Sequence, residues 1–409
     1  MTSQPESTTR PPRLLSLDVY RGLIMCLLAV NGFAVSLTAK KLGYGPDASP
    51  ETLIGRIWQW LAFHNSHPQW NSQFYVVGCS LWDLIQPSFM FMVGVAMPYS
   101  YASRKKRGDS DHSLRLHALI RAIVLVLIGA FLATRTTGFP SNRLFTNVLA
   151  QIGLGYFFVY LLLGASVRLQ IICGAIVLIA YAAFLTLYPV VDPQPRKSQD
   201  SAFSLSVPSP VAKQYALHTN GAARVDVSIL RLERGDKPLP VHRAGYATLN
   251  FIPAAVTMLL GVLAGTLLRS SRSDSQKLRQ LLLGGLICFT IAMVASFTVC
   301  PIVKKIWTPA WTLYSGGIVL WILAGLYWFV DVLGFKKWTW PFMIVGMNSL
   351  AMYLMGSLMK GWVVACAKVY LGKDIFAGDY GPMLQATTVF IVLWLFCLYL
   401  YRQKIFFRI

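Results

Sequence analysis

Apolar residues occur in long runs along this chain, and short polar breaks separate the runs. Many runs are about 20 residues long, the length at which a helix crosses the hydrocarbon core of a bilayer. An all-α bundle of about ten membrane-spanning helices is therefore expected. The spans are predicted at residues 17–37, 82–101, 117–134, 145–165, 169–188, 249–268, 281–299, 309–329, 340–358 and 386–400. The apolar segment 362–371 is too short to cross and is predicted to be re-entrant or interfacial.

Positive charge is concentrated in every second break, which is the signature of cytoplasmic loops. The basic breaks contain Arg10 and Arg13; Arg104, Lys105, Lys106, Arg107 and Arg115; Arg168; Arg269, Arg272, Lys277 and Arg279; Lys336 and Lys337; and Arg402, Lys404 and Arg408. Both termini are then cytoplasmic, and the longer breaks 38–81 and 189–246 lie outside an inner cell membrane. We expect a disordered stretch at 1–15, one membrane domain over 16–409, and an irregular cap rather than a separate domain at 189–246.

Composition supports a membrane protein and argues against a nucleic-acid partner. The chain is 55% hydrophobic and 13% charged, whereas soluble domains carry about 25% charged residues. The net charge of +21 resides in the short breaks, where topology explains it without nucleic acid. The cysteines fall mostly inside apolar runs, and a pairing among Cys79, Cys300 and Cys366 is left open. No metal-ligand spacing such as C-x-x-C is present, so no metal is expected.

Several polar residues interrupt the apolar spans, where such residues are costly and often functional. Asp18 and Arg21 are three residues apart and share a helix face, so they form a structural ion pair or leave Arg21 to face a phosphate. Asn31, Gln151 and Asn348 either link helices by hydrogen bonds or line a polar cavity.

A further polar group lies just before the second span. His67 and Trp70 precede it, and Asp83 stands at its start. An aspartate at a helix N-terminus fits the helix dipole without any chemistry, and a loop histidine often has no role. His64 lies three residues upstream of His67 and is an alternative candidate for any histidine function.

Five blocks together resemble the heparan-α-glucosaminide N-acetyltransferase family of membrane acyltransferases. They are SLDVYRG; HPQW followed by WDLIQPSFMFMVGVA; RLFTNVLAQIGLGY; KKIWTPAWTLYSGG; and GMNSLAMY. They occur in the family's order at matching span positions, and the resemblance covers nearly all of the membrane portion. The chain departs from the family pattern by an insertion, NSQFYVV, after Trp70 and by Ile152 where the family has an arginine.

The resemblance implies transfer of an acetyl group from cytosolic acetyl-CoA to an acceptor across the membrane. It assigns the catalytic histidine to His67, its partner asparagine to Asn31 and the aspartate of the next helix to Asp83. A neutral imidazole is a suitable general base, Asn31 could hold the thioester carbonyl or orient the imidazole, and Asp83 could fix the histidine tautomer. Direct transfer is our hypothesis, and a covalent acetyl-histidine is the rival mechanism.

Donor and acceptor sites follow from the same reasoning. The phosphates of CoA are expected near Arg21, Asp18, Arg104, Arg269 and Lys336, with the pantetheine arm passing Gln151 and Asn348. The acceptor is expected to be an amino sugar or a glycan, with N- and O-acetylation both open. Its candidate binding residues are Trp70, Arg143, Trp307 and His218.

A transporter of a polar solute is the alternative function, because a polar-lined cavity needs no chemistry. The surrounding bilayer is the remaining partner, and a homodimer is left open. Solute uptake that survives loss of His67 would favour the transporter.

Overall fold

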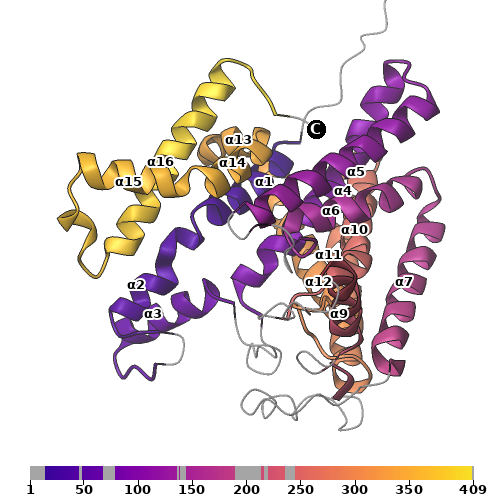
Figure 1. Cartoon of the computed structure of the whole chain (residues 1–409). Coiled ribbons are helices and arrows are strands. Elements are labelled where there is room, and N and C mark those ends of the chain that lie inside the picture. The colour runs from indigo at the N-terminus through magenta and orange to yellow at the C-terminus, as the bar shows by residue number, and fades with distance from the viewer. Residues whose placement is uncertain are drawn as a thin grey trace, which may run out of the picture.

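The computed structural model of the 409-residue chain describes residues 14–45, 48–67, 79–135, 138, 144–188, 213–215, 220–234 and 245–407. Across these ranges the chain is helical and contains no β-strand (Figure 1). Its α-helices are α1 (Leu15–Ala29), α2 (Val35–Lys41), α3 (Leu53–His64), α4 (Ile85–Lys106), α5 (Asp111–Thr134), α6 (Val148–Leu161), α7 (Val167–Leu187), α9 (Gly221–Arg234), α10 (Phe251–Arg269), α11 (Asp274–Thr298), α12 (Pro309–Leu326), α13 (Trp340–Met347), α14 (Ser349–Leu358), α15 (Lys360–Tyr370) and α16 (Gly381–Arg402).

Six helices in the described ranges are long and apolar enough to cross a bilayer, or up to eight if each of two bent pairs is one span. The bent pairs are α1 with α2, at 53°, and α13 with α14, at 69°. The prediction of about ten spans is therefore not confirmed, although each predicted span contains helix. Helix α6 has only 14 residues, and α4 carries three cations in its last turn.

Several helices begin directly after a short polar residue that caps the first helical turn. The hydroxyls of Ser110, Ser166 and Ser273 each accept a hydrogen bond from the backbone N–H three residues later, as does the side-chain oxygen of Asn147. Such caps satisfy backbone donors that have no partner inside the helix.

Glycines allow helices to pack with their backbones in close approach, as is common in membrane bundles. A Cβ atom on Gly346 of α13 would lie 1.9 Å from the carbonyl oxygen of Asp18 on α1, and one on Gly94 of α4 would lie 1.9 Å from that of Met258 on α10. These contacts join α1 to α13 and α4 to α10.

We expect Gly346→Ala to destabilise the protein by about 1–3 kcal/mol, because the added methyl forces the backbones of α1 and α13 apart. The matched control is Gly325→Ala on α12, where a Cβ would meet nothing within 4 Å. Thermal unfolding in detergent measures both. Equal midpoints for the two variants would contradict the close packing of α1 on α13.

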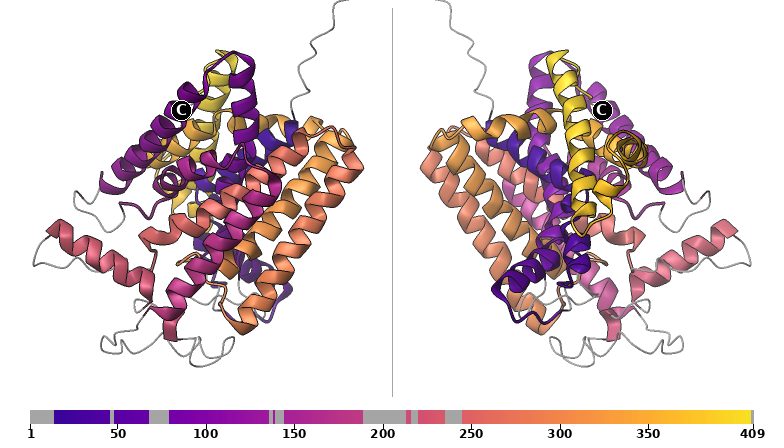
Figure 2. Two further views of the ribbon diagram at one scale, coloured as in Figure 1. Left: turned by 90° about the vertical axis from the view of Figure 1, so that its right-hand side faces the viewer. Right: turned by 90° about the vertical axis from the view of Figure 1, so that its left-hand side faces the viewer.

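The described parts of the predicted basic breaks come together at one end of the bundle, which we call the basic end; Arg10, Arg13 and Arg408 lie outside the described residues. Arg269 at the end of α10 donates to the carbonyl of Pro98 near the end of α4, over 2.7 Å. The carboxylate of Asp331, in the π-helical turn η6 (Tyr327–Val332), accepts from the N–H groups of Leu15 and Ser16 at the start of α1. Figure 2 shows the C-terminus at this end too. The two side views also show α10, α11 and α12 running side by side from the basic end.

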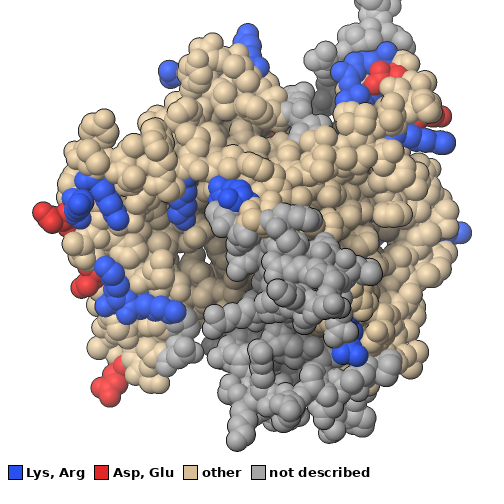
Figure 3. Space-filling view, viewed as in Figure 1, with Lys and Arg blue, Asp and Glu red and all other residues tan. Residues whose placement is uncertain are grey.

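Charge is unevenly distributed on the surface. In Figure 3, lysines and arginines form separate groups, at the upper right and over the left half of the molecule among other places, and broad tan areas between them carry no charge. Exposed apolar side chains on α5, α7 and α11 agree with a lipid-facing surface. These observations support a multi-pass membrane protein, whereas which side of the membrane the basic end faces stays a prediction.

Three helices lie in segments for which no membrane span was predicted. Helix α3 lies within the predicted outer loop 38–81, and α9 lies within 189–246, which was expected to be irregular. Both are short, so they lack the long apolar run that marks a span. Helix α15 covers the short segment predicted to be re-entrant or interfacial, and Trp362, Val369 and Tyr370 on it are exposed. All seven cysteines are free thiols.

Candidate active site

Asp83 is the centre of a polar cluster at the end of α4 opposite the basic end. It lies in η2 (Leu81–Leu84), a short 3-10 turn that leads into α4. The Ser80 hydroxyl accepts from the Asp83 N–H at 3.2 Å, and the Asp83 carboxylate accepts from the Ser80 N–H at 3.4 Å. This reciprocal capping box holds the Asp83 side chain in place, and the residue is buried.

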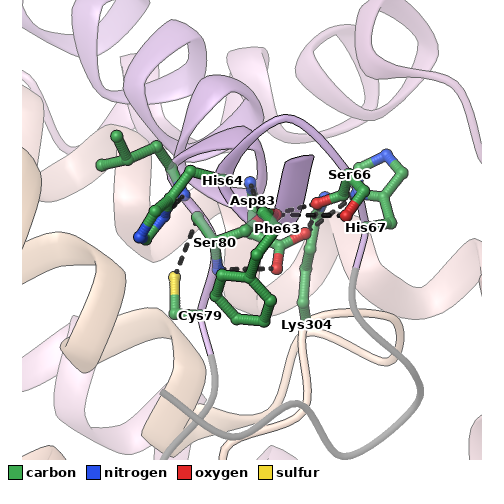
Figure 4. A network of polar contacts seen from close by, with 9 residues as sticks. Phe63, His64, Ser66, His67, Cys79, Ser80, Asp83 and Lys304 are labelled. Carbon is green, nitrogen blue, oxygen red and sulfur yellow. Dashed lines mark hydrogen bonds and ion pairs between the residues drawn. The ribbon is translucent and has the colours of Figure 1, made fainter. Parts of the chain in front are cut away.

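His67 follows α3 and points its ring at Asp83 (Figure 4). Its Nδ1 lies 2.9 Å from Asp83 Oδ1. The ring also meets Trp82 edge-on at 6.3 Å. The His67 side chain is 45% exposed, compared with 5% for Asp83. An external molecule can therefore reach the imidazole, while the Asp83 carboxylate is shielded from solvent.

Lys304 completes the cluster from the connection between α11 and α12 (Figure 4). Its ammonium lies 2.9 Å from Asp83 Oδ1 and 3.1 Å from His67 Nδ1, and its side chain is only 10% exposed. Sequence reasoning did not single out this residue. The sequence feature that could have indicated it is that Lys304 begins KKIWTPAW, part of one of the five blocks that carry the family resemblance.

The charges of Asp83 and Lys304 influence the protonation of His67. A carboxylate oxygen can accept from two donors: Asp83 Oδ1 accepts from the Lys304 ammonium, and it accepts from His67 too when Nδ1 carries the ring proton. In that tautomer the lone pair of His67 lies on Nε2, whereas in the other tautomer Nδ1 accepts from the Lys304 ammonium. Burial lowers the pKa of His67; the Asp83 hydrogen bond opposes that shift and the Lys304 charge reinforces it. Burial alone would lower the pKa of Lys304, but Asp83 outweighs it and the pKa is raised.

Hydrogen bonds between the end of α3 and η2 hold the cluster together. The Ser80 hydroxyl donates to the carbonyl of Ser66 at 2.7 Å, and the Leu81 N–H donates to His64 Nδ1 at 3.3 Å. His64 is buried, and its ring packs against Trp60. His67 therefore contacts the Asp83 carboxylate, whereas His64 bonds the backbone of the turn that contains Asp83.

Asn31 lies in a strained turn that borders the cluster. Asn31, Gly32, Phe33 and Ala34 all have positive φ, between 50° and 59°, a left-handed turn that costs non-glycine residues about 1–2 kcal/mol each. Gly32 packs so closely that a Cβ there would lie 2.3 Å from Asn65 and 3.1 Å from the Trp82 ring. Asn31 itself is exposed. The break between α1 and α2 thus places Asn31 close to the neighbours of His67.

Trp307 lies three residues after Lys304 and is buried, with φ of 47°. Its indole N–H has no hydrogen-bond partner among the described residues, and neither has that of Trp311. Asn250 donates to the carbonyl of Lys305 at 2.8 Å, which ties this connection to the start of α10. Buried donors without partners are uncommon, so these indoles are candidate contacts for a ligand.

The predicted phosphate-binding residues lie at the basic end, away from His67. Arg21 pairs with Asp18 at 2.5 Å, and Arg21 Nε has no partner in the described chain. Arg104 pairs with Asp109 at 3.4 Å. Arg269 bonds Pro98, as described above, and Lys336 is exposed. These residues share one end of the bundle but form no single cluster.

The two predicted lining residues bond to protein groups. Gln151 donates to the carbonyl of Ala247 at 3.3 Å and accepts from Gln86 at 3.5 Å. Asn348 sits at the break between α13 and α14, where its amide bonds the backbone of Ile405 and Phe407 in the C-terminal tail. Both therefore link separate segments of the chain.

Three predicted substrate residues, Trp70, Arg143 and His218, lie outside the described residues, as do most of the predicted disordered N-terminus and the insertion after Trp70. Among the residues described, no group of His, Cys, Asp or Glu could hold a metal ion.

Comparisons with known proteins agree with the resemblance in the sequence blocks. The chain is 24% identical over 453 residues to heparan-α-glucosaminide N-acetyltransferase of Mus musculus and 25% identical over 444 residues to that of Homo sapiens. These alignments cover 99% and 98% of this chain but only 62% and 60% of the relatives. The chain thus spans about three fifths of their length. No family model matches it.

These similarities support a distant relationship with that acetyltransferase family.

Proposed function

We propose that this protein moves an acetyl group from acetyl-CoA, entering at the basic end, to an extracytoplasmic amino sugar or glycan at His67. The observation that carries the proposal is the cluster of His67, Asp83 and Lys304 at the opposite end of α4 from Arg104. The pantetheine arm of CoA carries its thioester at the tip, so this arm would extend from phosphates on the basic-end side into the bundle toward His67.

Each group in the cluster has a defined role in the proposed reaction. The acceptor amine attacks the thioester carbonyl while His67 Nε2 takes the proton from the nitrogen. The C–S bond then breaks, and His67 returns that proton to the departing CoA thiolate. Asp83 would hold the imidazole in the tautomer with Nδ1 protonated, and Asn31 would donate to the oxyanion.

Lys304 keeps the histidine neutral at working pH. A positive charge beside the imidazole disfavours a second positive charge on it, so Nε2 stays free to accept a proton. The same ammonium neutralises Asp83, which without a cationic partner would favour the imidazolium.

The proposal predicts the pH profile of Lys304→Met. Removing the ammonium leaves Asp83 facing His67 alone and raises the pKa of the imidazole, whereas the wild-type pKa lies below its ordinary value. Because the base works only when neutral, kcat/KM falls as the pH drops through this pKa. The acid limb of the variant should therefore move to higher pH than in the wild type. An unmoved limb would contradict this role for Lys304.

The activity itself is tested by mass spectrometry of products. Membranes containing the chain are incubated with acetyl-CoA and a panel of amino sugars and glycans, and masses raised by one acetyl group are sought. Acetylated product that depends on both acetyl-CoA and His67 supports the proposal. Solute uptake in vesicles, unaffected by His67→Gln and without any acetylated product, would instead support a transporter.

A further inference from the structure

Helix α5 carries one arginine inside its apolar run. Arg121 lies four residues beyond His117, where the predicted membrane span begins, which is about 6 Å along the axis. The residues from Ala122 to Thr134 contain no charged side chain. A cation inside a membrane-spanning segment is costly and usually has a partner.

The described part of the chain provides no carboxylate for Arg121. None of its ion pairs within 4 Å includes this residue, and the nearby Asp109 already pairs with Arg104. Arg121 Nε is buried without a hydrogen-bond partner. The guanidinium instead lies 4.9 Å from the ring centre of Tyr156 on α6, which leaves planar donors available for an anion.

Aromatic rings and further cations surround this position. Tyr101 on α4 meets Tyr160 on α6 at 6.2 Å, and the ammonium of Lys105 lies 5.8 Å from the Tyr101 ring. Tyrosines and cations together are typical of the membrane–water interface. The adjoining face of α5 is apolar and exposed; it contains Leu116, Leu119, Ile120 and Ile123.

We propose that the basic-end surface formed by α4, α5 and α6 binds an anionic phospholipid, with Arg121 as the main ligand of its phosphate. The guanidinium fork matches two phosphate oxygens, and the tyrosines contact the glycerol region. The exposed apolar face of α5 receives the acyl chains. Water-soluble CoA has the same phosphate chemistry but no acyl chains for that face, so a lipid is the better fit. The site is independent of the acceptor and of His67.

Native mass spectrometry of the purified full-length chain, titrated with phosphatidylglycerol or phosphatidylcholine, tests this site. The wild type should bind phosphatidylglycerol more tightly, and Arg121→Gln should weaken that binding about tenfold, as expected for one charge-assisted contact. The matched control is Arg115→Gln, on the same helix but exposed, which should change binding by about twofold at most. Arg121→Lys, which keeps the charge without the fork, should bind with intermediate affinity and serves if Arg121→Gln does not fold.

Equal binding of the two lipids, or full phosphatidylglycerol binding by the Arg121 variants, would overturn the proposal. A parallel titration with CoA distinguishes the two phosphate sources. If Arg121→Gln weakens CoA binding and leaves lipid binding unchanged, the site belongs to the donor and the lipid proposal fails.

Discussion

Replacing His67 by glutamine should lower kcat/KM for acetyl transfer by about 10²–10⁴-fold, the usual contribution of a general base. Glutamine keeps a polar group of similar reach but cannot take a proton at neutral pH. The half-exposed position of His67 means that the substitution buries no new polar group, so the thermal midpoint should stay near that of the wild type. Steady-state kinetics with purified enzyme and labelled acetyl-CoA measure the loss.

His64→Gln is the matched control, because His64 accepts one hydrogen bond from the Leu81 N–H and the glutamine carbonyl can accept it too. A much smaller loss of kcat/KM is expected there than for His67→Gln. If His64→Gln inactivates the folded enzyme while His67→Gln remains active, the two histidines have been assigned the wrong way round.

The second large effect concerns the buried pair of Asp83 and Lys304. Asp83→Asn should destabilise the protein by about 3–5 kcal/mol, because it leaves the Lys304 ammonium buried without its counter-charge. The double variant Asp83→Asn with Lys304→Met removes both charges, and it should recover most of that stability. Activity should not recover, since Asp83 is then absent and cannot orient His67.

Thermal unfolding in detergent and kcat/KM, measured on the same four proteins of this cycle, separate the two effects. Recovery of stability without activity supports a functional pair. Recovery of activity along with stability would show that Asp83 and Lys304 serve only the fold, and additive destabilisation would show that the two charges do not interact.

The run of apolar residues predicts where helix forms but not where a helix breaks. Spans at 17–37 and 340–358 were predicted as continuous, whereas the chain bends at Asn31–Ala34 and at Asn348. Hydropathy averages over a window and carries no information on backbone dihedral angles. An asparagine inside each run, followed directly by Gly32 in the first of them, was a local signal, since asparagine and glycine tolerate left-handed or irregular backbone better than most residues.

The candidate site was predictable where its residues are near one another in the sequence. His67 and Asp83 are 16 residues apart, and the sequence blocks already pointed to both. Lys304 is 221 residues from Asp83, and only the tertiary fold shows that the two charges meet. Gln151 and Asn348 were noticed as polar groups inside spans, but most of their partners are backbone carbonyls and N–H groups that no side-chain pattern indicates.

The central claim is that donor and acceptor meet His67 from opposite ends of the bundle, and transfer across a sealed membrane tests it most directly. Proteoliposomes hold acetyl-labelled acetyl-CoA inside and glucosamine outside, so only molecules with the basic end inward can act. The account predicts labelled N-acetylglucosamine in the outer solution with the wild-type chain and none with His67→Gln. Labelled product that forms only when donor and acceptor share a compartment, or that forms equally with His67→Gln, would contradict it.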